Sequence, residues 1–287
     1  MNRRNLILSV SVASIAFLVL YWEVIRKLVY DWSHDENNSH GFFIVPIAVY
    51  FAWERRQTLI ALTPKPSSLG LFVILGSLAT LVAGTLGAEL FLTRISMIGM
   101  AIGITLFLLG WAHLRALVFP IGFLLLMIPL PLLVFNQIAF PLQLLASRFG
   151  EWTLQLLGIP VLREGNIINL ANTRLEVAEA CSGIRSLISL LTLGIVLGYF
   201  TDSRWTVRWL IALATIPVAI AANGIRVAGT GVAAHFVGAE AATGFLHTFS
   251  GWILFILASV LLLMIQRAAV WILPPPSNPA RTAEAIG

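Results

Sequence analysis

The sequence has 287 residues, of which 59% are hydrophobic and only 11% are charged. A soluble domain has about 25% charged residues and could not bury this much apolar surface, so the composition excludes a soluble globular protein and requires lipid around much of the chain. The formal net charge of +5 does not indicate a nucleic-acid partner, because the basic residues are scattered among apolar runs and form no basic face.

Eight apolar segments are long enough, or nearly so, to cross a bilayer as helices, which takes about 20 residues. They cover residues 5–22, 41–53, 69–87, 95–112, 116–135, 182–200, 207–224 and 250–267. The first resembles a signal peptide but is expected to stay as a span, because its apolar run is long and no clear cleavage site follows. The second is short, and Pro120, Pro129 and Pro131 are expected to kink or break the fifth.

Between the fifth and sixth segments, Gln137 to Leu157 has apolar residues at helical spacing, which predicts a helix lying in the membrane interface. Ile159 to Glu179 is rich in Val, Ile, Asn and Gly and predicts a short hairpin. We therefore expect an all-α integral membrane protein, a bundle of about eight transmembrane helices with a small hairpin and an interfacial helix. Residues 1–273 would form one membrane domain, and the Pro- and Ala-rich residues 274–287 a disordered cytoplasmic tail.

The distribution of charge indicates an orientation. With both termini in the cytoplasm, the inner segments hold ten of the 18 basic residues but only three of the 13 acidic ones. The positive-inside rule favours this arrangement. The three longest loops, Trp32 to His40, Asn136 to Cys181 and Ile225 to Ser250, then lie outside.

Three chemically active residues are expected at the outer ends of consecutive spans. Cys181, the only cysteine, begins the sixth span, Arg226 follows the seventh and His247 precedes the eighth. A thiolate can attack a carbonyl carbon, a cation can stabilise the oxyanion, and an imidazole can protonate the leaving amine, so this set can perform acyl transfer. A nearby cation and a helix N-terminus would both lower the pKa of the thiol, and Gly183 would permit a tight turn into the helix.

Each of these residues also has a structural interpretation. A lone cysteine in a membrane protein is commonly a small buried hydrophobe. Arg226 could extend to the lipid headgroups, and His247 could be an interfacial polar residue. Arg185, about one turn inside the sixth span, could pair with Glu179 or Glu176 or meet a substrate, because a buried charge in a membrane is costly.

Several segments resemble the exosortase family. Glu176–Ser186, with Cys181 at its centre, resembles the nucleophile motif, Asn223–Arg226 matches the Asn-x-x-Arg signature, and Gly244–His247 matches the His signature. Gly158–Asn166 is similar to the segment before the cysteine, and Trp32–Gly41 to the first outer loop. The resemblance extends over residues 30 to 260 in the family's order and spacing. At Asn38 the family often has tyrosine, which leaves the role of His40 open.

The resemblance implies a membrane cysteine peptidase or transpeptidase with eight spans and a periplasmic hairpin, in the bacterial inner membrane. Its substrates would be exported proteins ending in a Pro-Glu-Pro motif, a transmembrane helix and a basic tail. Cys181 would be the nucleophile that forms a thioacyl enzyme, Arg226 would stabilise the oxyanion, and His247 would act as general acid and then base. Water or an unknown acceptor would resolve the thioacyl group.

The supporting or substrate-binding residues would be Glu179, Arg185, Asn223 and His40. No cofactor, metal or nucleic acid is expected, and membrane lipid surrounds the protein. A metal site at His34 and His40 would need their acidic neighbours, but the spacing matches no strong zinc signature, and a solvated acidic loop is the preferred interpretation.

Two other functions remain open from the sequence. One is a transporter or an export component for exopolysaccharide, which the intramembrane Arg185 and the proline-broken fifth span would suit. No pair of matching broken helices indicates inverted repeats, however. The other is a non-catalytic assembly factor, for which the convergence of Cys181, Arg226 and His247 would be a coincidence.

Overall fold

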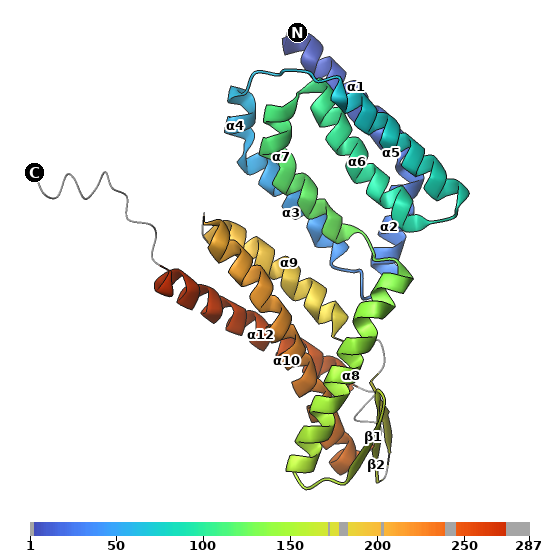
Figure 1. The fold of residues 1–287 in the computed structure, drawn as a ribbon, viewed down its shortest axis with the longest axis vertical. Helices are drawn as coiled ribbons and strands as arrows, with labels where there is room; N and C mark the ends of the chain where they lie inside the picture. Colours follow the sequence, from blue (N-terminus) through green and yellow to red (C-terminus); the bar gives the residue numbers. More distant parts are fainter. Residues whose placement is uncertain (1–2, 172, 178–182, 202–203, 239–244, 274–287) are drawn as a thin grey trace, which may run out of the picture. The chain divides into compact units, whose positions relative to one another are not determined.

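The computed structural model describes residues 3–171, 173–177, 183–201, 204–238 and 245–273, and for residues 245–250 it describes the backbone alone. The chain divides into two compact units, residues 1–134 and 135–287. Figure 1 shows their helices and strands.

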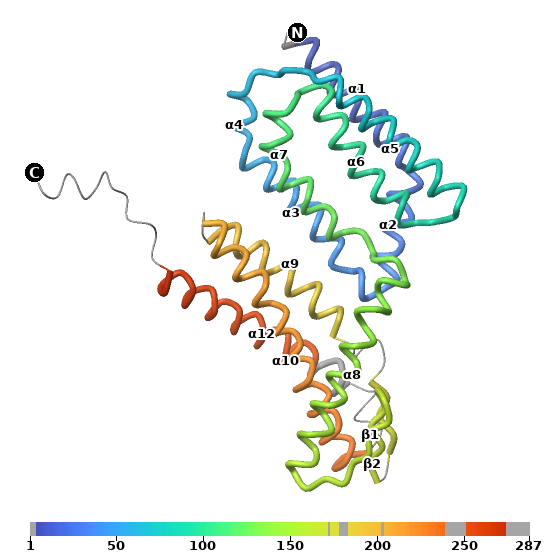
Figure 2. Tube along the Cα trace, in the orientation of Figure 1, coloured from blue at the N-terminus to red at the C-terminus, as the bar shows by residue number. Residues whose placement is uncertain are grey.

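The first unit is helical. Its elements are α1 (Arg3–Leu20), α2 (Trp22–His34), α3 (Gly41–Glu54), α4 (Arg56–Ala61), α5 (Leu69–Leu86), α6 (Leu90–Leu108), α7 (Trp111–Phe123) and the 3₁₀ helix η1 (Leu124–Met127). Helices α5 and α6 run antiparallel along their whole length (Figure 2). Glycines permit this approach, since a Cβ atom on Gly84 would lie 2.9 Å from the backbone of Thr93 and one on Gly103 would lie 2.9 Å from the backbone of Ile74.

Polar side chains join the helices of the first unit. Arg94 of α6, only 3% exposed, forms an ion pair with Asp31 of α2. The Tyr21 hydroxyl lies 3.1 Å from that of Ser96. Trp32 donates from its indole nitrogen to the Met127 carbonyl at 3.0 Å. Because buried polar groups need partners in an apolar environment, these bonds fix α2 against α6 and η1.

The second unit contains α8 (Leu132–Leu156), a three-stranded sheet, α9 (Ile184–Thr201), α10 (Trp205–Val237) and α12 (Phe245–Ile272). Helices α9, α10 and α12 pack together (Figure 1), with α10 antiparallel to the other two. Two buried clusters hold them at successive levels. One contains Leu190, Val218, Ala219 and Ala258, and the other contains Val207, Ile211 and Leu262.

Small residues bring α9 and α10 close. A Cβ atom on Gly194 would lie 2.5 Å from the Thr215 methyl group, and one on Gly198 would lie 3.3 Å from the Cα of Arg208. This glycine pair, at small-xxx-small spacing, therefore serves close helix packing.

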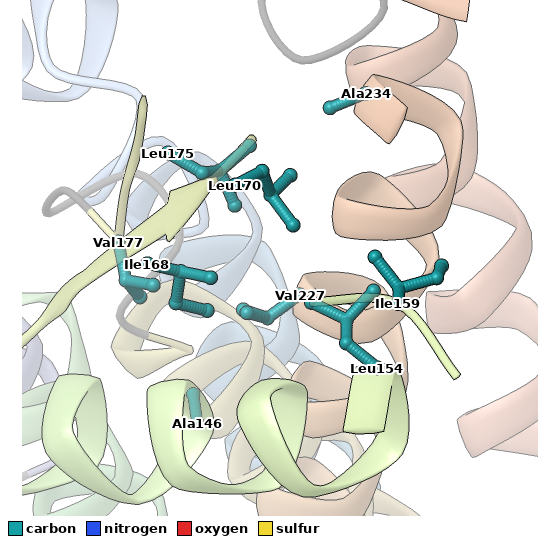
Figure 3. Close-up of a cluster of buried hydrophobic side chains, with 9 residues drawn as sticks. All are labelled: Ala146, Leu154, Ile159, Ile168, Leu170, Leu175, Val177, Val227 and Ala234. Carbon is teal, nitrogen blue, oxygen red and sulfur yellow. The ribbon is translucent and has the colours of Figure 1, made fainter. Parts of the chain in front are cut away.

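The sheet is antiparallel in the order β1 (Val161–Glu164), β2 (Ile167–Leu170) and β3 (Arg174–Glu176). Gly165, at φ +66°, makes the tight turn between β1 and β2. Figure 3 shows the buried side chains that attach the sheet to α8 and α10. Ile168 of β2 lies between Ala146 of α8 and Val227 of α10 in this cluster.

The structure confirms an all-α membrane protein, with differences from the expected spans. Six described helices are long and apolar enough to cross a membrane, or seven if the bent pair α1 and α2, at 62°, forms one span. The count of eight is not confirmed. The predicted span 116–135 is interrupted, because α7 and η1 end at Met127 and α8 begins at Leu132, beyond Pro129 and Pro131. Where a two-stranded hairpin was expected, the structure has a three-stranded sheet.

Helix α8 differs from the expected interfacial helix over residues 137–157. It has 25 residues and is apolar enough to cross a membrane. It also runs parallel to α10, since Phe149 and Leu154 of α8 contact Gly224 and Gly231 of α10 in that order. The predicted boundary between residues 273 and 274 stays a prediction, because residues 274–287 lie outside the described part of the chain.

Candidate functional site

The segment with Asn223 and Arg226 lies inside a helix and does not follow one. The seventh span was expected to end at residue 224, but α10 continues without a break to Val237. Small residues let this last part of α10 pack closely against α8. A Cβ atom on Gly224 would clash with Phe149, one on Gly231 would clash with Leu154, and Ala228 is buried on α10. Arg226 lies 21 residues from Trp205, about 32 Å along the helix axis, which is close to the thickness of the apolar layer of a bilayer.

Gly183 brings the start of α9 onto α10 at this level. Its φ is +77°, in the left-handed region that glycine adopts without strain. A Cβ atom there would also lie 2.8 Å from Cγ of Asn223. The Gly183 carbonyl accepts a hydrogen bond of 2.8 Å from the backbone N–H of Leu187 and so begins the helix. Only glycine satisfies both the turn and the contact.

Asn223 and Arg226 form a bonded pair on one face of α10. The amide side chain of Asn223 is 6% exposed. Its Oδ1 accepts a hydrogen bond of 2.7 Å from Nη2 of Arg226. Spacing i, i+3 brings both side chains to the same helix face. The buried amide therefore fixes the direction of the guanidinium, a group with five N–H donors in all.

Helix α12 reaches the same pair. A Cβ atom on Gly251 would lie 3.6 Å from Nη1 of Arg226, so the Gly251 position of α12 faces the guanidinium. His247 precedes Gly251 by four residues within α12 and therefore belongs to the same face, about one turn nearer the start of the helix. The His247 side chain itself is not described.

The other predicted site residues fall in different places. Cys181 and Glu179 lie outside the described residues. Arg185 is half-buried in the first turn of α9. His40 belongs to the first unit, and its Nε2 lies 3.0 Å from the Leu126 carbonyl. Burial lowers the pKa of His40. The structure thus brings Gly183, Asn223, Arg226 and the His247 face together, and it leaves His40 in a separate unit.

The acidic loop between α2 and α3 in the first unit forms hydrogen bonds within itself. Asp35 accepts hydrogen bonds from the backbone of Asn37 at 2.9 Å and the side chain of Asn38 at 2.5 Å. Nδ1 of His34 lies 3.0 Å from the Tyr30 carbonyl. In the part of the chain that the structure describes, no group of three His, Cys, Asp or Glu residues could hold a metal ion.

A pocket beside Gly183 and Asn223 was not predicted from the sequence. It has a volume of about 490 Å³ and lies between α8 and α10, with Leu187 of α9 at one side. Its walls are apolar, including Leu142 and Trp152 of α8 and Pro217 of α10. Arg148 of α8 is the one charged residue among those that line it. Periodicity along single helices could not predict this pocket, because its walls come from three separate segments.

The fold defines a multi-pass membrane protein with polar groups gathered at one level of a helix bundle. The chain belongs to the exosortase family, since the family model described as transmembrane exosortase (Exosortase_EpsH) matches residues 32–264. No curated protein and no solved structure gave a match. Membership gives the chain an exosortase-type membrane function with exported proteins as its general class of substrate. The matched range includes the candidate site, the whole of α8, α9 and α10, and α12 as far as residue 264.

Proposed function

We propose that the protein is a membrane cysteine peptidase or transpeptidase. It cleaves exported proteins at a C-terminal signal with a Pro-Glu-Pro motif, a transmembrane helix and a basic tail. Cys181 is the nucleophile, Arg226 stabilises the oxyanion and His247 is the general acid and base. The proposal puts this site in residues 1–273, at the periplasmic face of the bacterial inner membrane.

The observation that carries the proposal is the contact between Gly183 and Asn223. Gly183 follows Cys181 by two residues, and two peptide units span at most about 7 Å. Asn223 in turn accepts a hydrogen bond from Arg226. Chain connectivity and this bond support the proposal that the Cys181 thiol acts beside the Arg226 guanidinium. The approach of Gly251 to Arg226 supports the inclusion of the His247 face.

The chemistry follows from these groups. The Cys181 thiol loses its proton to His247, and the thiolate sulfur bonds to the scissile carbonyl carbon. Arg226 donates hydrogen bonds to the oxyanion that develops on the carbonyl oxygen. The C–N bond then breaks, the imidazolium returns its proton to the leaving amine, and a thioester remains on Cys181.

The second half of the reaction releases the protein. An acceptor amine or water loses a proton to the neutral imidazole and attacks the thioester carbon. The C–S bond breaks and the thiolate leaves. Water yields hydrolysis, and an amine yields a transfer product. Mass spectrometry of the released C-terminus distinguishes the two, because hydrolysis leaves a free carboxylate and transfer adds the mass of the acceptor.

The test uses a co-expressed reporter protein with a Pro-Glu-Pro C-terminal signal, and cleavage is measured as a decrease in the reporter's size on a gel. We expect wild-type enzyme to shorten the reporter and Cys181→Ala and Cys181→Ser to leave it intact, with equal amounts of all three enzymes in the membrane. Continued processing by both variants would exclude Cys181 as the nucleophile. The transporter and assembly-factor functions would then be preferred, because neither requires the thiol.

Charge supports the proposed orientation, since ten of the 18 basic residues fall in the expected cytoplasmic segments. Reporter domains fused after residues 34 and 273 test it. An alkaline phosphatase fused after residue 34 should be active in the periplasm, and one fused after residue 273 should be inactive. The opposite pattern would reverse the orientation.

A further inference from the structure

The pocket between α8 and α10 opens onto the same groups as the candidate site. Gly183 and Asn223 both line it. The exposed lining surface is almost entirely apolar, and its volume of about 490 Å³ is enough for several side chains of a peptide. Asn223 is therefore shared between the Arg226 pair and the wall of the pocket.

Arg148 lies at the level of this pair. Helices α8 and α10 run parallel where they meet, and a Cβ atom on Gly224 would lie 2.8 Å from the ring of Phe149. Arg148 precedes Phe149, and Asn223 precedes Gly224, so the two polar residues occupy the same height along the bundle. The pocket thus has a cation on the α8 side and a buried amide on the α10 side.

Among the residues that the structure describes, Arg148 forms none of the three ion pairs, and its side chain is exposed. The nearest acidic residue along the helix, Glu151, is bonded instead to Arg163 of β1 at 2.8 Å. A cation at the edge of an apolar pocket favours a ligand that brings an anion to it, because a charge-assisted hydrogen bond is stronger than a neutral one. A bound segment that carries one carboxylate among apolar side chains would complement the pocket.

We propose that this pocket holds the substrate segment next to the scissile bond, with a carboxylate of the segment paired to Arg148 and its apolar side chains against Leu142, Trp152 and Pro217. This inference rests on the proposed function and names the residue that selects the substrate. The acidic residue of a Pro-Glu-Pro signal supplies the carboxylate. Arg148 binds and does not take part in the chemical step.

Charge reversal tests the pairing. Arg148→Glu should lower the rate of processing of the Glu-bearing reporter about tenfold at low reporter level, which is the effect of losing one charge-assisted hydrogen bond. A reporter with Pro-Lys-Pro should be processed poorly by wild-type enzyme and better by Arg148→Glu. Arg174→Glu is the matched control, because Arg174 of β3 is also exposed in the same unit but does not line the pocket. It should process both reporters as wild type does.

Two results would overturn the inference while leaving the proposed function intact. One is equal processing by Arg148→Glu and Arg174→Glu. The other is a loss in Arg148→Glu that is the same for both reporters, which would assign Arg148 to lipid headgroups or to the fold. Failure of wild-type enzyme to process either reporter would contradict the proposed function instead.

A binding measurement is independent of catalysis. In a Cys181→Ala background, a photo-crosslinking residue at Ala221, which lines the pocket, should capture the Glu-bearing reporter, and the same residue at Phe236 should not. Phe236 is 75% exposed on α10 and lies outside the pocket. Adding Arg148→Glu should reduce capture at Ala221. Equal crosslinking yields at both positions would contradict the proposal. So would a yield at Ala221 that Arg148→Glu leaves unchanged.

Discussion

Gly183 and Asn223 lie so close that a methyl group on Gly183 would approach Cγ of Asn223 to 2.8 Å. Because Gly183 also has a φ of +77°, Gly183→Ala adds a steric contact and about 1–2 kcal/mol of backbone strain. We expect this variant to accumulate in the membrane but to process the reporter at least tenfold more slowly, measured by gel shift.

Gly229→Ala is the matched control for that variant. Gly229 lies in α10 with no atom within 4 Å of the added Cβ, so alanine there should leave processing unchanged and stabilise the helix by up to about 1 kcal/mol. Normal processing by Gly183→Ala would mean that the close contact with Asn223 has no bearing on the site.

Arg226→Lys should abolish most of the activity. The planar guanidinium donates to Asn223 with one nitrogen and keeps other donors for an oxyanion, and an ammonium group cannot reproduce this fork. We expect the first-order rate of processing to fall about a hundredfold, as when one oxyanion donor is removed. Arg208→Lys, at the other end of α10, should remain within about twofold of wild type. Near-normal turnover of Arg226→Lys would remove Arg226 from the mechanism.

The Arg94–Asp31 pair should dominate the stability of the first unit. Arg94 is 3% exposed, and removing one partner of a buried pair leaves a desolvated charge, which costs about 3–5 kcal/mol. Asp31→Ala should therefore lower the unfolding temperature in detergent markedly. Adding Arg94→Met should recover part of the loss, since it removes the unpaired charge.

The exposed pair Arg26–Glu23 provides the comparison, with side chains 66% and 64% exposed. Glu23→Ala should cost less than about 1 kcal/mol. If Asp31→Ala and Glu23→Ala lowered the unfolding temperature equally, the Arg94–Asp31 pair would contribute no more to stability than an exposed ion pair does.

His40 should make the loop between α2 and α3 sensitive to acid. Burial lowers its pKa in the folded protein, so the unfolded loop binds a proton more readily than the folded one. Loop stability is complete above the unfolded pKa of about 6.5 and falls as the pH drops below it. The hydrogen-exchange protection factors of residues 35–41, which correct for the intrinsic slowing of exchange in acid, should fall between pH 6.5 and 5. His40→Gln can still donate to the Leu126 carbonyl and should remove this fall; an unchanged pH profile in that variant would exclude His40 as its source.

Long apolar runs predicted the helices best. The expected spans 69–87 and 182–200 agree with α5 and α9 to within two residues at each end, because their polar flanks coincide with the helix ends. Polar residues misled the prediction for α10, where Asn223 and Arg226 suggested an end. Inside the bundle their side chains bond to each other, so the backbone continues as helix.

The site could be predicted in outline only. Chain order and span ends predicted that residues near 181, 226 and 247 share one level, and the contacts of Gly183 and Gly251 agree for the described parts. Side-chain geometry could not be predicted in this way. The hydrogen bond from Arg226 to Asn223 and the apolar pocket beside Arg148 both depend on packing between helices. The pattern of apolar residues along one helix does not predict such packing.

Helix α10 is about 50 Å long, whereas the apolar layer of a membrane is about 30 Å thick. Its first part packs with α9 and α12, its last part packs with the sheet, and Asn223 and Arg226 lie between the two. Because α10 is one continuous helix, its packing at both ends sets the position of the Arg226 guanidinium along the helix axis and its direction around that axis. One residue inserted after Arg226 would rotate the part of α10 that packs with the sheet by about 100° relative to the guanidinium, so the helical register between the two parts ties the sheet to the site.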